Sequence, residues 1–267
     1  MPYVTSVIPI RDKNPTRSFP VVTYALIAVN VVVFLFEQYV EQSFGELGAQ
    51  ALFMRYGVVP WALLYGDDPV RFVTPLSSMF MHGGWMHIIG NMWFLHIFGD
   101  NVEDRLGKGR FLAFYLLSGF AAAFAQVAID PGSKLPMVGA SGAVAGVLAG
   151  YVLLYPRARV LTLLPVFFLW FVEVPAFFFI FVWFGMQLLQ GTIALGSIGD
   201  NVGGTAFFAH IGGFLMGLVL VKLFARRERP KRDPRPPRVH YLDERLPPQV
   251  RDAYRSRRDD WGFDRDN

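Results

Sequence analysis

The sequence has no cysteine and few charged residues. The absence of cysteine from all 267 residues excludes a disulfide scaffold, thiol catalysis and zinc sites built on cysteine. Charged residues make up 17% of the chain and hydrophobic residues 53%, which leaves too much apolar surface for disorder over most of its length. Length alone permits one large domain or two small ones.

The chain also lacks a net charge outside its last segment. Residues 1–225 hold 12 Lys and Arg against 12 Asp and Glu, whereas residues 226–267 hold 13 against 9 and account for the whole net charge of +4. The basic character therefore belongs to a tail, and we expect no nucleic-acid partner. This tail is rich in Arg, Asp and Pro, a composition typical of disorder.

Six long apolar stretches dominate the rest of the chain. A transmembrane helix needs about 20 apolar residues, and six stretches of this size cannot all be core helices of a soluble domain. We therefore predict an all-α fold, a polytopic bundle of six transmembrane helices over residues 21–225, after an N-terminal segment 1–20 and before the tail 226–267. The stretches are 21–36, 83–99, 111–129, 137–155, 175–195 and 205–221.

Lysine and arginine mark one side of this bundle. They gather in the N-terminal segment and in every second gap between the spans, whereas the alternate gaps contain only Arg55, Arg71 and Lys134. The asymmetry predicts that both termini are cytoplasmic. Two segments are left over: we expect residues 37–80 to form short helices at the membrane surface, and residues 160–172 to lie at the interface without spanning, before a fifth span that starts at Pro175.

Polar side chains within the spans are candidates for function, because a bilayer makes them costly. Span four opens with GASG at 139–142, which contains Ser141, and its next turns present only Ala and Gly on two adjacent rows. Span six carries His210, Gly213 and Gly217 on one face. Two faces of small residues allow close helix approach, so Ser141 can meet His210, and an imidazole can accept the proton of a serine nucleophile at neutral pH.

Span two adds two further groups on one face, His87 and Asn91. Both can donate hydrogen bonds to a developing oxyanion, as can the backbone N–H of Ser141 at the start of its helix. The predicted topology places Asn91 and His210 at a similar depth, about 10 Å below the non-cytoplasmic ends of their helices. For this geometry, the loop 130–138 must dip inward over a water-filled cavity.

Each of these residues also has a structural interpretation. A serine beside glycine often serves packing alone, and a histidine one turn from an asparagine can simply clasp two helices. His82, at the mouth of span two, could support His87 or cap the helix. The coincidence of depth on three spans favours a catalytic site over separate structural roles.

The sequence resembles the rhomboid intramembrane serine proteases over roughly residues 7–224. The similarity is carried by MFMHGGWMH at 79–87 with Asn91, GDNVEDR at 99–105, GASG at 139–142 and AHIGG at 209–213. The opening IPIRD at 8–12 and the six-span plan resemble bacterial members. The resemblance implies a Ser–His dyad without an aspartate, in which Ser141 is the nucleophile and His210 the base.

The resemblance also implies the surroundings of that dyad. His87 and Asn91 correspond to the oxyanion-stabilising pair, with His82, Gly139 and Gly142 as supporting residues. One position departs from the pattern: some members have an aromatic residue four positions after the serine, where it stacks on the catalytic histidine, and this chain has Ala145. Either another element supplies the contact that orients His210, or His210 is held less tightly.

The sequence thus predicts a serine endopeptidase of the cell membrane that needs no metal and no cofactor. Its partners would be the lipid bilayer and single-span membrane proteins, cut in or near the outer part of the bilayer; the oligomeric state stays open. Two alternatives remain. One is an inactive relative that binds membrane-protein clients, and the other is a transporter, against which stands the lack of a carboxylate suited to ion coupling within the spans.

Overall fold

The computed structural model describes residues 8–166, 168–196, 207–225 and 247–248. The chain divides into two compact units, residues 1–226 and 227–267. In the second unit only Pro247 and Pro248 are described, so the predicted disordered tail lies outside the described residues. All that follows concerns the first unit.

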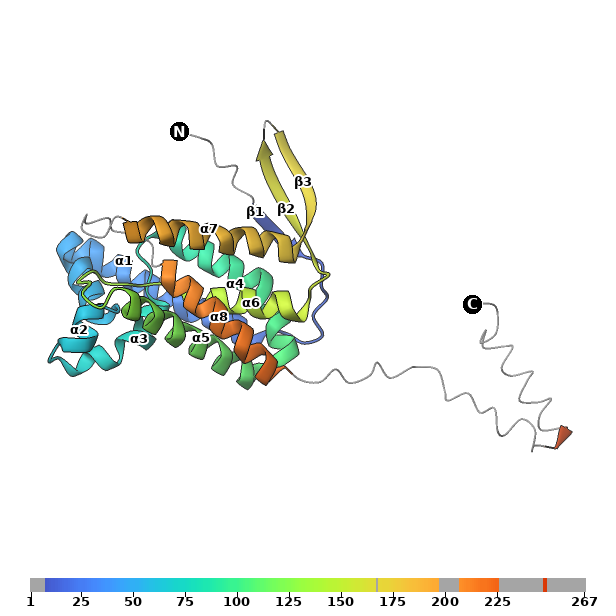
Figure 1. Ribbon diagram of the computed structural model, residues 1–267, viewed down its shortest axis with the longest axis horizontal. Helices are drawn as coiled ribbons and strands as arrows, with labels where there is room; N and C mark the ends of the chain where they lie inside the picture. The colour runs from blue at the N-terminus through green and yellow to red at the C-terminus, as the bar shows by residue number, and fades with distance from the viewer. Residues whose placement is uncertain (1–7, 167, 197–206, 226–246, 249–267) are drawn as a thin grey trace. The chain divides into compact units, whose positions relative to one another are not determined.

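The first unit is mostly helical, which confirms the predicted helical membrane bundle (Figure 1). Three helices, α1, α5 and α8, are long and apolar enough to cross a membrane, and α6 and the first part of α7 are apolar but shorter. The count of six spans stays a prediction. The α-helices are α1 (Val21–Tyr56), α2 (Pro60–Tyr65), α3 (Thr74–Ser77), α4 (Trp85–Leu106), α5 (Lys108–Ile129), α6 (Ser141–Leu154), α7 (Ala176–Gly196) and α8 (Phe207–Phe224), with 3₁₀ turns η1 (Pro69–Phe72) and η2 (Ser78–Phe80).

The first helix is longer than the sequence indicated. It continues past residue 36 to a kink at Gly45, and a second, shorter helical stretch then runs to Tyr56, within the region where the sequence predicts short helices. The reason is local: residues 37–44 contain no glycine or proline, so nothing stops the helix when its apolar stretch ends. Gly45, at φ +70°, interrupts the helix with a backbone conformation that favours glycine.

A small antiparallel sheet was not predicted. Its strands β1 (Ile8–Asp12), β2 (Arg159–Val166) and β3 (Phe168–Pro175) pair in the order β1-β2-β3. The sequence predicts only a non-spanning segment at residues 160–172, because their almost unbroken apolar character hides the two-residue alternation that identifies a strand. The indole of Trp93 donates to the carbonyl of Pro9 (2.6 Å) and holds β1 against α4.

The sheet is also tied to the helices through Asp12. The Asp12 carboxylate accepts hydrogen bonds from the Asn101 side-chain amide and from the Tyr151 hydroxyl, both at 2.8 Å. Asn101 lies near the end of α4 and Tyr151 near the end of α6. One carboxylate thus joins the sheet to two helices at the same end of the bundle.

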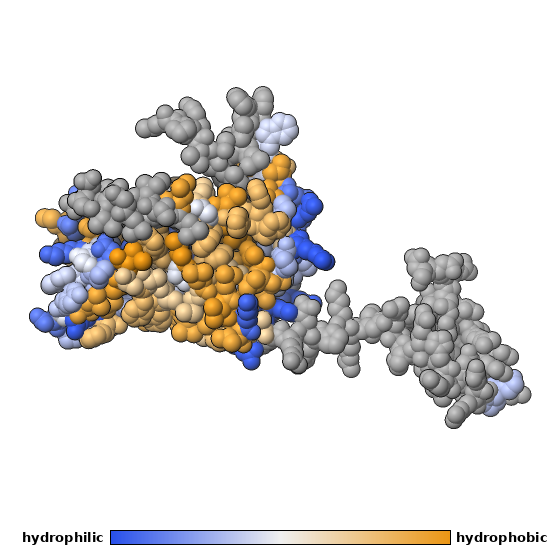
Figure 2. All heavy atoms as spheres, in the orientation of Figure 1, coloured by the Kyte–Doolittle hydropathy of each residue, from blue (hydrophilic) through white to orange (hydrophobic). Residues whose placement is uncertain are grey.

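Helix α6 is the centre of the bundle. Every residue from Gly142 to Tyr151 is buried, and α6 packs against α4, α5 and α8. On the face of the bundle shown in Figure 2, apolar side chains cover the middle, whereas hydrophilic residues gather at the two ends. A buried helix of small residues lets its neighbours approach closely, which is the packing expected in a membrane bundle.

Candidate active site

The structure brings Ser141 and His210 together. Ser141 is the first residue of α6, and His210 lies in the first turn of α8 with 7% of its surface exposed. The His210 Nε2 and Ser141 Oγ atoms are 2.7 Å apart, within hydrogen-bonding distance. A neutral imidazole that is unprotonated at Nε2 can accept the serine proton across this distance.

Glycines on both helices make this contact possible. A Cβ atom added at Gly213 would lie 2.0 Å from the carbonyl oxygen of Gly142, and one at Gly217 would lie 2.4 Å from that of Gly146. No side chain fits at either α8 position, so the two backbones touch directly. The prediction that small-residue faces pack α6 against α8 is confirmed. Gly142 also meets α5, where its added Cβ would lie 2.3 Å from that of Ala122.

Gly139 brings His87 to the same site. Its φ of +135° is accessible to glycine and strained for other residues, and its N–H donates to the Ser78 carbonyl at 2.9 Å. A Cβ added to Gly139 would lie 2.7 Å from His87 Nε2 and 3.5 Å from Ser141 Oγ. The His87 imidazole and the Ser141 hydroxyl therefore face the same small volume, which a side chain at position 139 would fill.

Asn91 lies one turn after His87 on α4 and is 7% exposed. Its amide nitrogen is buried and has no hydrogen-bond partner among the described residues. A buried donor without a partner is costly in a folded protein, and an oxyanion at the Ser141 site is the kind of acceptor that would satisfy it.

His82 packs against the His87 ring. It is 1% exposed, its ring lies edge-on to the His87 ring with centroids 5.1 Å apart, and neither ring nitrogen has a partner within the described part of the chain. The first turn of α4 has no side-chain cap. Of the two roles considered for His82, support of His87 therefore fits the structure, and capping of the helix does not.

The aromatic contact to the histidine comes from α7. Ala145 is fully buried inside the bundle, whereas the Trp183 ring lies 5.8 Å from the His210 ring, centroid to centroid, at an angle of 38°. Trp183 is 27 residues from His210 in the sequence, in an apolar helix where the sequence shows no other sign of function. Only the fold could reveal it.

Two buried glutamates were missed by the sequence analysis. Glu103 of α4 accepts from the backbone N–H groups of Val22 and Thr23 (3.0 and 2.7 Å) at the start of α1. Glu37 of α1 accepts from the backbone N–H of His82 at 3.2 and 3.3 Å. Both carboxylates thus bind backbone donors and fasten α1 to the start and end of α4, which is a structural use and weakens the transporter hypothesis.

A cavity of about 650 Å³ lies next to these groups. It is bounded by the second half of α1, by residues 82–85 at the start of α4 and by residues 134–136. Glu37 and His82 are part of its lining. The loop before Ser141 thus borders a cavity, but the lining includes neither Ser141 nor His210, so a water-filled path to the dyad stays a prediction.

The sequence is similar to that of several known proteins. A model of the rhomboid domain matches residues 68–227. The chain is 28% identical over 211 residues to Rhomboid-like protein 11, chloroplastic, of Arabidopsis thaliana, a match that covers 75% of this chain and 64% of that protein. It is 27% identical over 207 residues to Rhomboid protein 1, mitochondrial, of Saccharomyces cerevisiae (73% and 51%). It is also 32% identical over 147 residues to the Presenilin-associated rhomboid-like protein, mitochondrial, of Bos taurus (54% and 36%).

The fold and its apolar belt define a multi-pass helical membrane protein. The rhomboid domain model matches more than half of this chain, so the chain belongs to the rhomboid family. The matches span between about a third and two thirds of the length of these three relatives.

Proposed function

We propose that the protein is an intramembrane serine endopeptidase with Ser141 as nucleophile and His210 as general base. The observation that carries the proposal is the 2.7 Å contact between His210 Nε2 and Ser141 Oγ, at the first residue of a buried helix. Family membership supports the reaction class, since rhomboids generally include serine proteases of this kind.

The proposed reaction runs in two stages. In the first, His210 Nε2 takes the Ser141 proton as Oγ attacks the scissile carbonyl carbon, and the resulting imidazolium then protonates the departing amine. In the second, His210 takes a proton from water, the hydroxide attacks the acyl-enzyme, and Ser141 recovers its proton as the carboxylic acid leaves. The oxyanion of both stages would be stabilised by His87, Asn91 and the Ser141 N–H.

The substrates would be single-span membrane proteins with helix-destabilising residues near the cut. The positions of Lys and Arg support a six-span topology with both termini in the cytoplasm, so the site would open toward the opposite face. The resemblance of the opening segment to bacterial members supports the cell membrane as its location. The names of the relatives assign those proteins to chloroplasts and mitochondria.

The main alternative is an inactive relative that binds membrane-protein clients. Such a protein has no need for a serine and a histidine in hydrogen-bonding contact, which is why the structure favours the enzyme. Reconstitution distinguishes the two: the protein is placed in liposomes with a single-span reporter whose outer segment contains glycine and proline.

We expect wild-type protein to cut the reporter and Ser141→Ala or His210→Ala to leave it whole. Gly109→Ala is the matched control, because a Cβ at this α5 position would meet nothing within 4 Å. Cleavage by Ser141→Ala at the wild-type rate would overturn the proposal, and co-purification of uncut reporter with active-site-intact protein would favour the inactive relative.

A further inference from the structure

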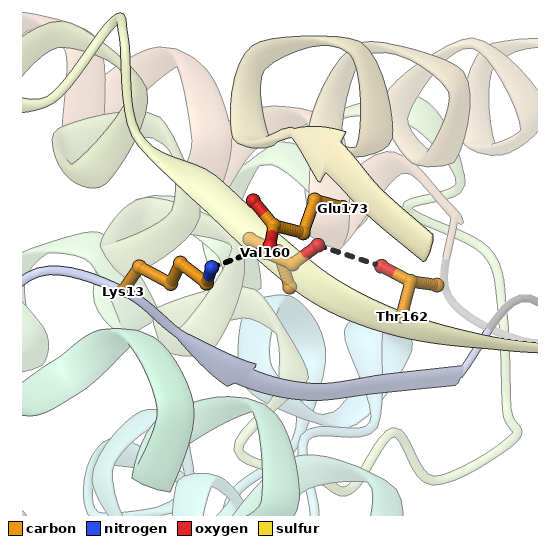
Figure 3. A network of polar contacts seen from close by, with 4 residues as sticks. All are labelled: Lys13, Val160, Thr162 and Glu173. Atoms are coloured by element: carbon orange, nitrogen blue, oxygen red, sulfur yellow. Dashed lines mark hydrogen bonds and ion pairs between the residues drawn. The ribbon is translucent and has the colours of Figure 1, made fainter. Parts of the chain in front are cut away.

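The hairpin formed by β2 and β3 carries a long apolar segment. Residues 163–172 read LLPVFFLWFV and include no polar side chain. The hydroxyl of Thr162, just before this segment, donates to the Val160 carbonyl at 3.1 Å and so needs no other partner (Figure 3). Strand β1 pairs with β2 at the base of the hairpin, from Ile8 opposite Leu163 to Asp12 opposite Val160.

Beyond its base, the hairpin has apolar residues on both faces. Trp170 and Phe171 are neighbours on β3, so their side chains point to opposite faces of the strand. They are 58% and 63% exposed. An isolated hairpin with large aromatic side chains exposed to water on both faces is unstable. These side chains therefore need an apolar environment from outside the hairpin.

The base of the hairpin has the opposite character. Lys13, which follows β1, forms an ion pair with Glu173 of β3 (Figure 3). The backbone N–H of Lys13 donates to the Arg159 carbonyl at 3.1 Å. Arg11, Arg157 and Arg159 are exposed in the same region. An apolar end and a cationic base form the pattern that matches a membrane interface, where acyl chains meet anionic headgroups.

The hairpin is continuous with the lipid-facing side of the bundle. Its last strand leads directly into α7, whose first turns expose Phe177, Phe178 and Phe181 at 51%, 55% and 73%. Figure 1 shows the hairpin leaving the helices beside the start of α7. Its apolar surface therefore extends the surface that the bundle already presents to lipid.

We propose that the β2–β3 hairpin is a membrane anchor that lies in the interface of the leaflet on the predicted cytoplasmic side. Trp170 and Phe171 insert among the acyl chains, and Arg11, Arg157 and Arg159 bind anionic phospholipid headgroups. Lipid fits better than a second copy of the chain, because a protein interface covers one face of a hairpin and both faces are apolar here. The anchor lies at the interface and not in the bilayer centre, since the open edge of β3 needs water or headgroups as hydrogen-bond partners.

Depth measurements test this proposal, and the lack of cysteine makes them direct. Trp170→Cys and Phe171→Cys, each labelled with a nitrobenzoxadiazole dye, are reconstituted in vesicles of phosphatidylcholine and phosphatidylglycerol. Quenching is measured with aqueous iodide and with lipids that carry a nitroxide on the acyl chain near the headgroup. Phe181→Cys on α7 serves as the control for lipid exposure and Gly109→Cys, exposed near the start of α5, as the control for water exposure.

Both hairpin dyes should be quenched by the shallow nitroxide and protected from iodide relative to Gly109→Cys. Quenching by iodide and not by nitroxide would overturn the anchor. Protection from both, with a dependence on the protein-to-lipid ratio, would replace lipid with a second copy and overturn it as well. Nitroxide-labelled phosphatidylglycerol should quench more strongly than labelled phosphatidylcholine, and the double variant Arg157→Gln with Arg159→Gln should reduce this difference. Equal quenching by the two lipids in wild type would remove the headgroup part of the proposal.

Discussion

A single methyl group at Gly213 should disable the site without touching either reacting residue. In Gly213→Ala the new Cβ would start 2.0 Å from the Gly142 carbonyl oxygen. Real Cβ atoms essentially never lie closer than 3.0 Å to such an atom. Helices α6 and α8 must therefore separate by at least about 1 Å, the difference between these two distances. The neighbour is backbone, so no side-chain rotation can relieve the contact.

Two consequences follow, with separate magnitudes. Over-packing of this kind typically costs about 1 to 3 kcal/mol of folding stability. A displacement of about 1 Å between reacting groups can cost on the order of 10²-fold in rate, and the displaced helices here carry Ser141 and His210, one turn or less from the new methyl and its contact. The rate loss should therefore exceed what partial unfolding alone produces.

The assay is reporter cleavage in liposomes, with thermal unfolding measured on the same preparations. Gly109→Ala is the matched control, and it should be neutral or stabilising by up to about 1 kcal/mol, because alanine is the better helix former and the site is open. A Gly213→Ala variant that folds, melts like wild type and cleaves at the wild-type rate would refute the close approach of the two helices.

Three further predictions concern neighbouring groups. Asn91→Ala should lower cleavage about 10²- to 10³-fold while the protein still reacts with a fluorophosphonate, because only an oxyanion donor is lost; full activity would end that role. If the Trp183 ring orients His210, Trp183→Ala should lower kcat more than it changes KM, and Trp183→Phe should recover most of the loss. Equal rates for wild type and both variants would exclude this role of the ring. Burial raises the pKa of Asp12 from 3.8 to about 6, so the folded state holds this proton more tightly than the unfolded chain, and the stability contribution falls as pH rises through that window. Asp12→Asn should therefore weaken the loss of thermal stability between about pH 4 and about pH 7, and identical pH profiles for the two proteins would contradict this.

Sequence patterns were sufficient to predict the site residues that lie together on one face of a single helix. The small-residue rows of α6 and the spacing of His210, Gly213 and Gly217 on α8 are properties of a single helix, so their contact could be predicted before any fold was known. The same holds for His87 and Asn91 on α4, where periodicity places both on one side.

The sequence was insufficient wherever an apolar run has more than one solution. Residues 160–172 are apolar on both faces as a hairpin, so no alternation distinguished strand from helix. Glu37 lies one residue past the first apolar stretch and looked like the start of a surface loop; its buried partner, the backbone N–H of His82, is 45 residues away. Trp183 had no polar neighbour in sequence to mark it, and only the packing of α7 on α8 brings its ring to His210.

The claim that Ser141 is an activated nucleophile can be tested directly by its reaction with a fluorophosphonate, which phosphonylates a serine only when a base takes the proton. Detergent-solubilised wild-type protein and Gly109→Ala should be labelled, with the label on the peptide that contains Ser141. Ser141→Ala should remain unlabelled under the same conditions, and His210→Ala nearly so. Equal labelling of wild type and Ser141→Ala would contradict the proposed enzyme.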